Sequence, residues 1–257
     1  MKKSLTVFVG FILLFLLYWV VYAAAPEFHA RWLQGEDRGV EWVTFIGFLG
    51  ASFVLFFTLR SWKKMPRFAR LYILMTGLFF FVCAGEELSW GQRIFGFKTP
   101  ESIDVINRQG EANLHNINFR KFRESELGVW CVEHLGDTAV SVIERLRPSD
   151  VVSWYMKLFG IILPLVLVVW MRKKDSALRG YLSPPELIPC FLFPEIIHLI
   201  HPWTSRFGSW LIRPDAAHLV YWQNEEVLEM YWGLCILLAA LAISTAWRKR
   251  SACHPAE

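Results

Sequence analysis

The sequence predicts an all-α, polytopic helical membrane protein with about six transmembrane helices and extracytoplasmic interfacial helices. Apolar residues make up 54% of the 257 residues and stand in long runs, which a soluble core does not need. Clusters of Lys and Arg stand beside these runs, as is typical of membrane proteins oriented by positive charge. Acidic residues and histidines gather at the opposite ends of the runs. Together these observations predict a single integral membrane domain.

The apolar runs define the expected spans. A hydrocarbon core about 30 Å thick needs about 20 residues of helix. One run, which carries Pro189 and Pro194, is shorter, and we expect a short, bent crossing helix there. The expected spans cover residues 5–25, 40–59, 68–85, 153–171, 187–201 and 227–247.

The basic clusters predict the orientation. They lie at residues 2–3, 60–70, 172–179 and 248–250. All four can lie in the cytoplasm only if 187–201 crosses the membrane and 86–151 contains an even number of crossings. We therefore expect a bacterial inner membrane protein with both termini cytoplasmic and 86–151 outside. Ala23-x-Ala25 resembles a signal-peptide cleavage site, but the apolar run before it exceeds the usual length of roughly 7–15 residues, which favours an uncleaved anchor.

The extracytoplasmic segment contains a helical apolar pattern. Val132, Leu135, Ala139 and Val142 recur at helical spacing, with Glu133 among the charged residues between them. This predicts an amphipathic helix lying on the outer leaflet. Because the basic residues of the chain are accounted for as membrane anchors and form no patch, no nucleic-acid partner is expected.

A pair of carboxylates ends the third span. Glu86 and Glu87 follow an apolar run, where acids at a helix C-terminus oppose the helix dipole and so cost stability. We predict Glu86, Glu87 and Arg93 as catalytic residues, with Glu87 as a general base and Arg93 binding a phosphate or carboxylate. The structural alternative is an interfacial cap in which Trp90 is a belt residue.

A second polar motif covers residues 107–116. If this stretch is helical, Glu111 and His115 lie one turn apart on one face and form a two-ligand clip suited to Zn²⁺ or a di-iron centre. The alternative is a polar surface helix. The amide side chains nearby are predicted to bind a headgroup or to orient ligands: Gln92, Asn107, Gln109, Asn113 and Asn116.

Two further helices offer candidate metal ligands. Glu195 and His198 have the Glu-x-x-His spacing. His198 is a better ligand candidate than His201, which stands beside Pro202 at the end of the run, and the alternative for His198 is a hydrogen-bonded structural histidine. Glu226 lies in the first turn of the last span, where an acid also has a structural explanation, and Glu229 lies one turn deeper. We expect Glu87, His115, His198 and Glu226 to share one pocket. The predicted ligands of Zn²⁺ or another divalent metal are Glu111, His115, His198, Glu226 and Glu229.

The two motifs carry a family resemblance. Gly-Glu-Glu-x-Ser-Trp-Gly-Gln-Arg at 85–93, followed by Asn-x-Gln-Gly-Glu-x-Asn-Leu-His-Asn at 107–116, is similar to a pattern in a family of bacterial multi-pass membrane proteins without an assigned activity. The resemblance implies that these residues belong together. Glu86-Glu87 also resembles the Glu-Glu-x-x-x-Arg motif of CAAX-type membrane proteases, but Arg93 stands two positions too late for it.

Two classes of function remain open from the sequence. The first is an integral membrane enzyme, a metal-dependent hydrolase or transferase acting on a lipid or lipid-linked headgroup at the outer leaflet. The second is a non-catalytic membrane protein, either a proton-linked transporter or an assembly partner. Transport would use the same acids and histidines as a relay, but no polar residues continue toward the cytoplasmic side.

Overall fold

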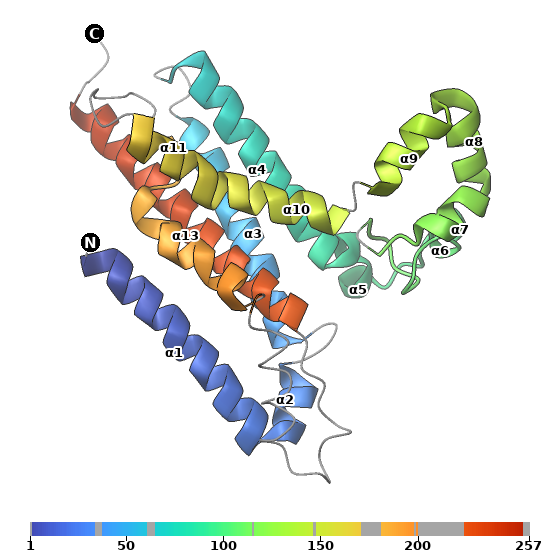
Figure 1. The fold of residues 1–257 in the computed structure, drawn as a ribbon, viewed down its shortest axis with the longest axis horizontal. Helices are drawn as coiled ribbons and strands as arrows, with labels where there is room; N and C mark the ends of the chain where they lie inside the picture. The colour runs from blue at the N-terminus through green and yellow to red at the C-terminus, as the bar shows by residue number, and fades with distance from the viewer. Residues whose placement is uncertain are drawn as a thin grey trace. The chain divides into compact units, whose positions relative to one another are not determined.

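The computed structural model describes residues 2–33, 38–60, 65–114, 116–145, 148–170, 181–197, 199 and 224–253. These residues form helices and turns, with one isolated antiparallel bridge between Asn107 and Ile117 (Figure 1). Contacts divide the chain into two compact units. The first unit is Met1–Phe81 with Met156–Glu257, and the second is Val82–Tyr155.

Among the residues that the structure describes, four helices are long and apolar enough to cross a membrane, which supports a multi-pass membrane protein. They are contained in α1 (Lys2–Ala24), α3 (Gly39–Thr58), α4 (Arg67–Glu87) and α13 (Asn224–Cys253). Each matches a predicted span to within a few residues, because about 20 apolar residues suffice to specify a crossing helix. The short helix α2 (Pro26–Trp32), which begins on a proline at its first turn, was not predicted.

The fourth predicted span, 153–171, is a shorter apolar helix, with its apolar part at Val151–Val166. It consists of α10 (Pro148–Lys157), the π-helical turn η3 (Leu158–Ile162) and α11 (Leu163–Trp170). Pro164 explains the wide turn, because a proline removes one backbone donor and its ring collides with the carbonyl four residues earlier. The fifth predicted span, 187–201, begins with η5 (Pro185–Leu187) and a helix at 188–197, and its end lies outside the described residues.

Helices α3 and α13 lie side by side and run in the same direction (Figure 1). Gly47 packs against Gly233, where an added Cβ would come within 2.5 Å of backbone, and Gly50 faces Leu237. Further along both helices, the Arg248 guanidinium lies over the Phe57 ring. The two glycines therefore allow the backbones to touch, as small residues do between membrane helices.

The other neighbours in the first unit run in opposite directions. Ser52 of α3 donates a 2.9 Å hydrogen bond to the Gly77 carbonyl of α4, while Phe48 packs on Phe80. These two contacts show that α3 and α4 are antiparallel, because the residue number rises along α3 from one contact to the other while it falls along α4.

The shorter apolar segments also run antiparallel to their neighbours. Lys157 pairs with Glu195 at 3.2 Å, and Phe159 packs on Phe191, so 157–162 and 188–197 are antiparallel. Along α13, Phe193 packs on Tyr231, whereas Tyr181 lies against Trp247 further along, so 181–197 also runs against α13.

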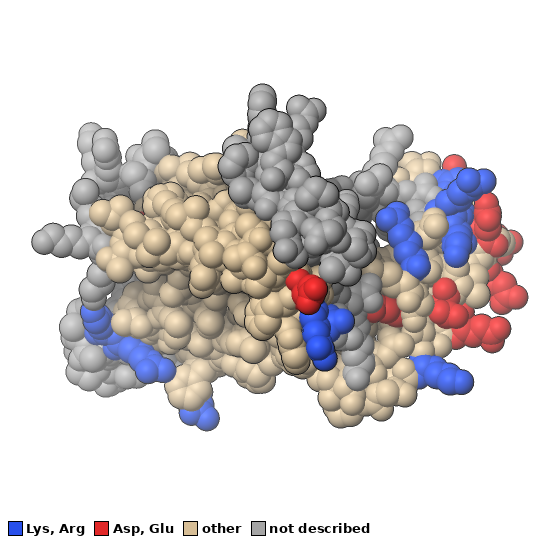
Figure 2. Space-filling view, turned by 90° about the horizontal axis from the view of Figure 1, so that it is seen from below, with Lys and Arg blue, Asp and Glu red and all other residues tan. Residues whose placement is uncertain are grey.

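The second unit holds a polar loop and a set of short helices. The helices are α5 (Gln92–Phe95), α6 (Glu101–Asp104), α7 (Phe119–Glu124), α8 (Glu126–Leu135) and α9 (Asp137–Arg145). The amphipathic helix predicted around Val132–Val142 is in fact two helices, because Gly136 has φ +83° and ends α8. Figure 2 shows Lys, Arg, Asp and Glu gathered over this unit, while the described surface of the first unit is mostly uncharged.

Candidate functional site

The loop that follows α4 begins with a left-handed turn. Ser89, Trp90 and Gly91 have φ values of 47°, 57° and 83°. For residues with a side chain this conformation costs roughly 1–2 kcal/mol each. The cost at Ser89 and Trp90 means that surrounding contacts must hold the turn in place, and backbone strain of this kind clusters at functional sites.

Glu111 is the centre of those contacts. Its Oε2 accepts hydrogen bonds from the Ser89 hydroxyl at 2.9 Å and from the Asn113 side-chain amide at 2.6 Å. The same Asn113 amide also donates to the Ser89 Oγ at 3.1 Å. The exposed fractions of Ser89, Asn113 and Glu111 are 0%, 2% and 9%. A carboxylate is therefore held inside the loop by two directed hydrogen-bond donors.

Asn107 organises the backbone of the second motif. Its Nδ2 donates to both the carbonyl and the side-chain oxygen of Asn113, each at 3.0 Å. Its Oδ1 accepts from the backbone N–H of Gln109 at 2.8 Å and of Glu111 at 3.2 Å. The side chain is buried, so these four bonds supply partners that water cannot.

Glu86 and Gln92 of the first motif bind the backbone of the second. The Glu86 oxygens accept from the Trp90 indole at 2.7 Å and from the Leu114 N–H at 2.5 Å. Gln92 accepts from the Ala112 N–H and donates to the Thr99 hydroxyl, both at 2.7 Å. The two sequence motifs are thus interlocked by side-chain-to-backbone hydrogen bonds. We call residues 86–118, held in this way, the polar loop.

The two remaining predicted amide side chains, Gln109 and Asn116, bind each other. Asn116 donates a hydrogen bond to the Gln109 side chain, which is exposed. Two backbone hydrogen bonds join the ends of this stretch: the Arg108 N–H donates to the Asn116 carbonyl, and the Asn118 N–H donates to the Ile106 carbonyl. The stretch is a closed loop, and the helix that would set Glu111 and His115 one turn apart is not formed over the described residues, because these side chains direct the backbone into turns.

Several predicted site residues are placed only in part. Glu87 is the last residue of α4 and is half-buried. Arg93 belongs to α5, with its side chain outside the described part, and His115 and His198 lie outside it altogether. Glu226 and Glu229 are half-buried residues of the first unit. The shared pocket expected for Glu87, His115, His198 and Glu226 therefore stays a prediction.

The predicted metal site likewise stays a prediction. Within the residues that the structure describes, no group of three or more His, Cys, Asp or Glu side chains is arranged to hold a metal ion. Two of the five predicted ligands, His115 and His198, fall outside that part of the chain.

Sequence reasoning missed two polar features of the first unit. His29 of α2 is fully buried, with its ring 4.7 Å from the Tyr18 ring and 5.1 Å from the Tyr22 ring. Lys157 lies inside an apolar segment and pairs with Glu195. A charge within an apolar run was the available signal for Lys157, whereas His29 stands in an ordinary polar stretch that carries no such signal.

The chain matches no protein-family model, no curated protein and no solved structure. The polar loop and the helices around it therefore carry the functional argument by their own geometry.

Proposed function

We propose that this chain is an integral membrane enzyme, a hydrolase or transferase that acts on a lipid or lipid-linked headgroup at the outer leaflet. The single observation that carries the proposal is the polar loop at the end of the apolar helix α4. In this loop a strained Ser89–Trp90 turn is held against the buried Glu111 carboxylate. Such preorganisation is what a catalytic site needs, because fixed groups need no reordering during the reaction.

Within this proposal the residues of the polar loop divide into two roles. Glu86, Gln92, Asn107 and Asn113 are positioning residues, since their polar atoms bind the loop itself. Glu87, at the end of α4, is the general base that removes a proton from water or a substrate hydroxyl. Arg93 binds the phosphate of the headgroup, because a guanidinium matches two phosphate oxygens at once.

A divalent metal is part of the proposal in its fuller form. Glu111 and His115, with His198 and either Glu226 or Glu229, would hold Zn²⁺ or a similar ion that activates water. Elemental analysis of the purified full-length protein should then find stoichiometric metal, and His115→Gln should lose it at unchanged abundance. Absence of metal would leave Glu87 as the base without a metal.

The proposed topology is six crossings of the bacterial inner membrane, with both termini cytoplasmic and 86–151 outside. It is supported by the helix directions, since parallel α3 and α13 require an odd number of crossings between them. Helix α4, the segment at 151–166 and the helix at 188–197 supply three. A cysteine at position 118 should react with an impermeant reagent in intact cells, and one at position 65 should not, in a chain lacking its native cysteines. The reverse pattern would overturn the topology.

The interfacial helices are proposed to be α8 and α9. Leu127, Trp130 and Leu135 are exposed on α8 and lie on one stripe, while Glu126 and Glu133 lie beside it. Both ends of the second unit continue into apolar helices, which keeps this stripe within reach of the bilayer. Bromine-labelled lipids should quench the fluorescence of Trp130, in a comparison with Trp130→Phe. Equal quenching of the two proteins would exclude the arrangement.

The test of the enzyme proposal compares cells that lack the chain with cells that express it. We expect a change in the headgroup composition of lipids or lipid-linked precursors, measured by mass spectrometry. Glu87→Gln should abolish the change at normal protein abundance and melting temperature. Glu126→Gln, an identical chemical change on an exposed residue of α8, should retain it. Identical lipid composition in all strains would reject the enzyme.

One observation favours a second candidate, a non-catalytic assembly partner. The polar side chains of the loop are largely bound to the loop's own backbone, as in a purely structural module. In that case Glu87→Gln would be harmless, whereas Asn107→Ala would reduce function only as far as it reduces folded protein. The ratio of function to folded abundance across these two variants therefore separates the candidates.

A further inference from the structure

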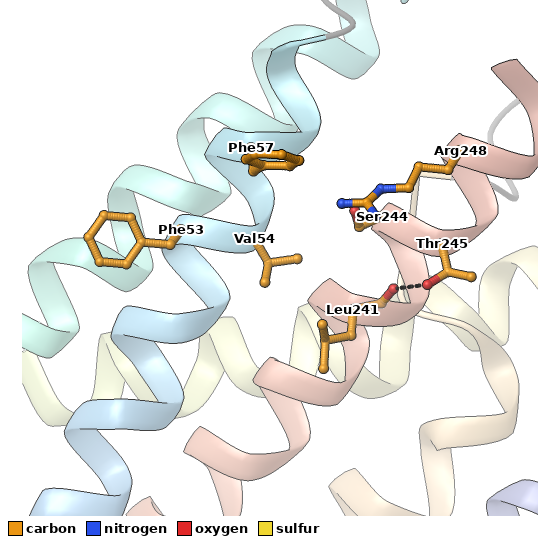
Figure 3. A pocket seen from close by; sticks show the side chains of 7 residues that line it. All are labelled: Phe53, Val54, Phe57, Leu241, Ser244, Thr245 and Arg248. Atoms are coloured by element: carbon orange, nitrogen blue, oxygen red, sulfur yellow. Dashed lines mark hydrogen bonds between the residues drawn. The ribbon is translucent and has the colours of Figure 1, made fainter.

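A groove opens between α3 and α13 near the ends of both helices (Figure 3). It measures about 400 Å³, within the range of small-ligand sites. Phe53 and Phe57 line it on α3, and Leu241, Ser244 and Thr245 line it on α13. The groove belongs to the first unit and lies apart in the sequence from the polar loop.

The wall of the groove is mainly apolar, although it includes Ser244 and Thr245. The Thr245 hydroxyl donates to the Leu241 carbonyl of its own helix at 2.7 Å, so its polarity is used within the helix. Ser244 is buried. Phe53 and Leu241 are 60% and 46% exposed although they belong to helices that can cross a membrane. Side chains of this kind at that place suit contact with hydrocarbon chains.

Two arginines meet at one end of the groove. The guanidinium carbon of Arg60 lies 4.2 Å from the centre of the Phe57 ring, and that of Arg248 lies 5.4 Å from it. Figure 3 shows the Arg248 side chain reaching from α13 toward α3. The ring face attracts both cations, and this brings two like charges to one place.

The stretches of sequence around the two arginines carry no carboxylate. Residues 53–70 and 230–256 contain neither Asp nor Glu. Arg60 follows the apolar helix Gly39–Thr58, and Arg248 lies at the end of Glu226–Lys249. Both guanidinium groups therefore stand where a spanning helix meets the headgroup layer, which is where lipid phosphates lie.

We infer that this groove is a binding site for an anionic phospholipid. The phosphate lies between Arg60 and Arg248, and one acyl chain follows the groove past Phe57 and Thr245 toward Phe53 and Leu241. The phosphate balances the charges of Arg60 and Arg248, and the acyl chain covers the exposed apolar wall of the groove. The site lies at the opposite ends of α3 and α13 from Glu226, so it is separate from the proposed headgroup chemistry.

The test titrates the full-length protein, purified in a neutral detergent, with phosphatidylglycerol and with phosphatidylcholine of the same chains. Native mass spectrometry counts the bound lipids. We expect saturable binding of phosphatidylglycerol with a preference over phosphatidylcholine. Arg248→Gln should weaken binding by about fivefold, since one basic residue near a membrane surface contributes about that factor, and Arg60→Gln should do the same.

Two further variants separate the charge from the groove. Lys249→Gln removes a neighbouring charge that does not line the groove, and it should leave the preference unchanged. Leu241→Trp fills the groove from a lipid-facing position, and it should weaken binding while both arginines remain. Inorganic phosphate should not compete below millimolar concentration, because it lacks the acyl chain.

Equal weakening by Arg248→Gln and Lys249→Gln would overturn the site and indicate general surface attraction. Unchanged binding in Leu241→Trp would overturn the placement of the acyl chain. Melting temperatures of each variant without lipid keep a folding defect apart from a binding defect.

Discussion

The α3–α13 pair and the polar loop are held together by opposite kinds of interaction. In the helix pair the backbones touch at Gly47 and Gly233, and aromatic and aliphatic side chains fill the remaining contacts. In the polar loop the contacts are hydrogen bonds that backbone N–H groups donate to the side chains of Glu86, Gln92 and Asn107.

The difference follows from what the backbone needs in each region. A helix satisfies its own N–H and C=O groups, so its side chains are available for packing against other helices or lipid. In the second motif of the polar loop, several amides lack a helical partner and bind side chains instead. Asn107, Gln92 and Glu86 accept from the N–H groups of Glu111, Ala112 and Leu114. The same residues that looked like ligands in the sequence thus also build the loop.

The largest effect is expected where two backbones touch. In Gly47→Ala the new Cβ would meet the Gly233 carbonyl carbon at 2.5 Å, and backbone atoms cannot move aside as side chains do. We expect a loss of about 3 kcal/mol of stability, seen as a lower melting temperature in detergent and lower membrane abundance. Gly10→Ala is the matched control, because nothing lies within 4 Å of its Cβ. Equal melting temperatures for the two variants would contradict the close packing.

A somewhat smaller effect is expected at the centre of the polar loop. Asn107→Ala removes four hydrogen bonds and leaves buried groups of Glu111 and Asn113 without those partners. We expect about 2–3 kcal/mol of local destabilisation. Hydrogen exchange should quicken at 105–118 and stay unchanged in α3 and α13. The exposed Gln109→Ala should cost less than about 0.5 kcal/mol, and comparable exchange in both variants would argue against the organising role of Asn107.

The helix caps of the second unit should have a more modest effect. Asn118 accepts hydrogen bonds from Arg120 N–H and Lys121 N–H at the start of α7. Asn118→Ala should destabilise α7 by about 1 kcal/mol, which hydrogen exchange within 119–124 would report. Ser102→Ala, on an exposed residue, should leave that exchange as it is. A cap without effect would mean that packing rather than the cap holds α7.

The smallest effects are expected for ion pairs, one in each unit. Lys157 and Glu195 pair at 3.2 Å with side chains 34% and 22% exposed, whereas Arg120 and Glu124 pair at 3.7 Å with side chains 91% and 71% exposed. Double-mutant cycles on the melting free energy should give up to about 1 kcal/mol for the first pair and about 0.3 kcal/mol for the second. Salt should weaken only the exposed pair, and salt sensitivity of the Lys157 pair would show that water reaches it.

The sequence alone determined the helical membrane class and the four longest apolar helices, because length and hydropathy are local properties that a bilayer reads directly. The family resemblance implied that 85–93 and 107–116 belong together, and in the structure Glu86 and Gln92 bind the backbone of the second motif. The helix considered for 107–116 is not formed over the described residues of that stretch, because Asn107 directs the backbone into a loop.

Only the tertiary structure decided which distant residues meet. The parallel packing of α3 on α13, the burial of His29 between Tyr18 and Tyr22, and the meeting of Arg60 with Arg248 at Phe57 join residues from different helices. The left-handed conformation of Ser89 and Trp90 belongs here too, because neither residue prefers it locally and the contacts with Glu111 and Glu86 stabilise it. Hydrophobic period and residue type report the environment that one segment needs, but the partner that supplies it is fixed by packing across the whole chain.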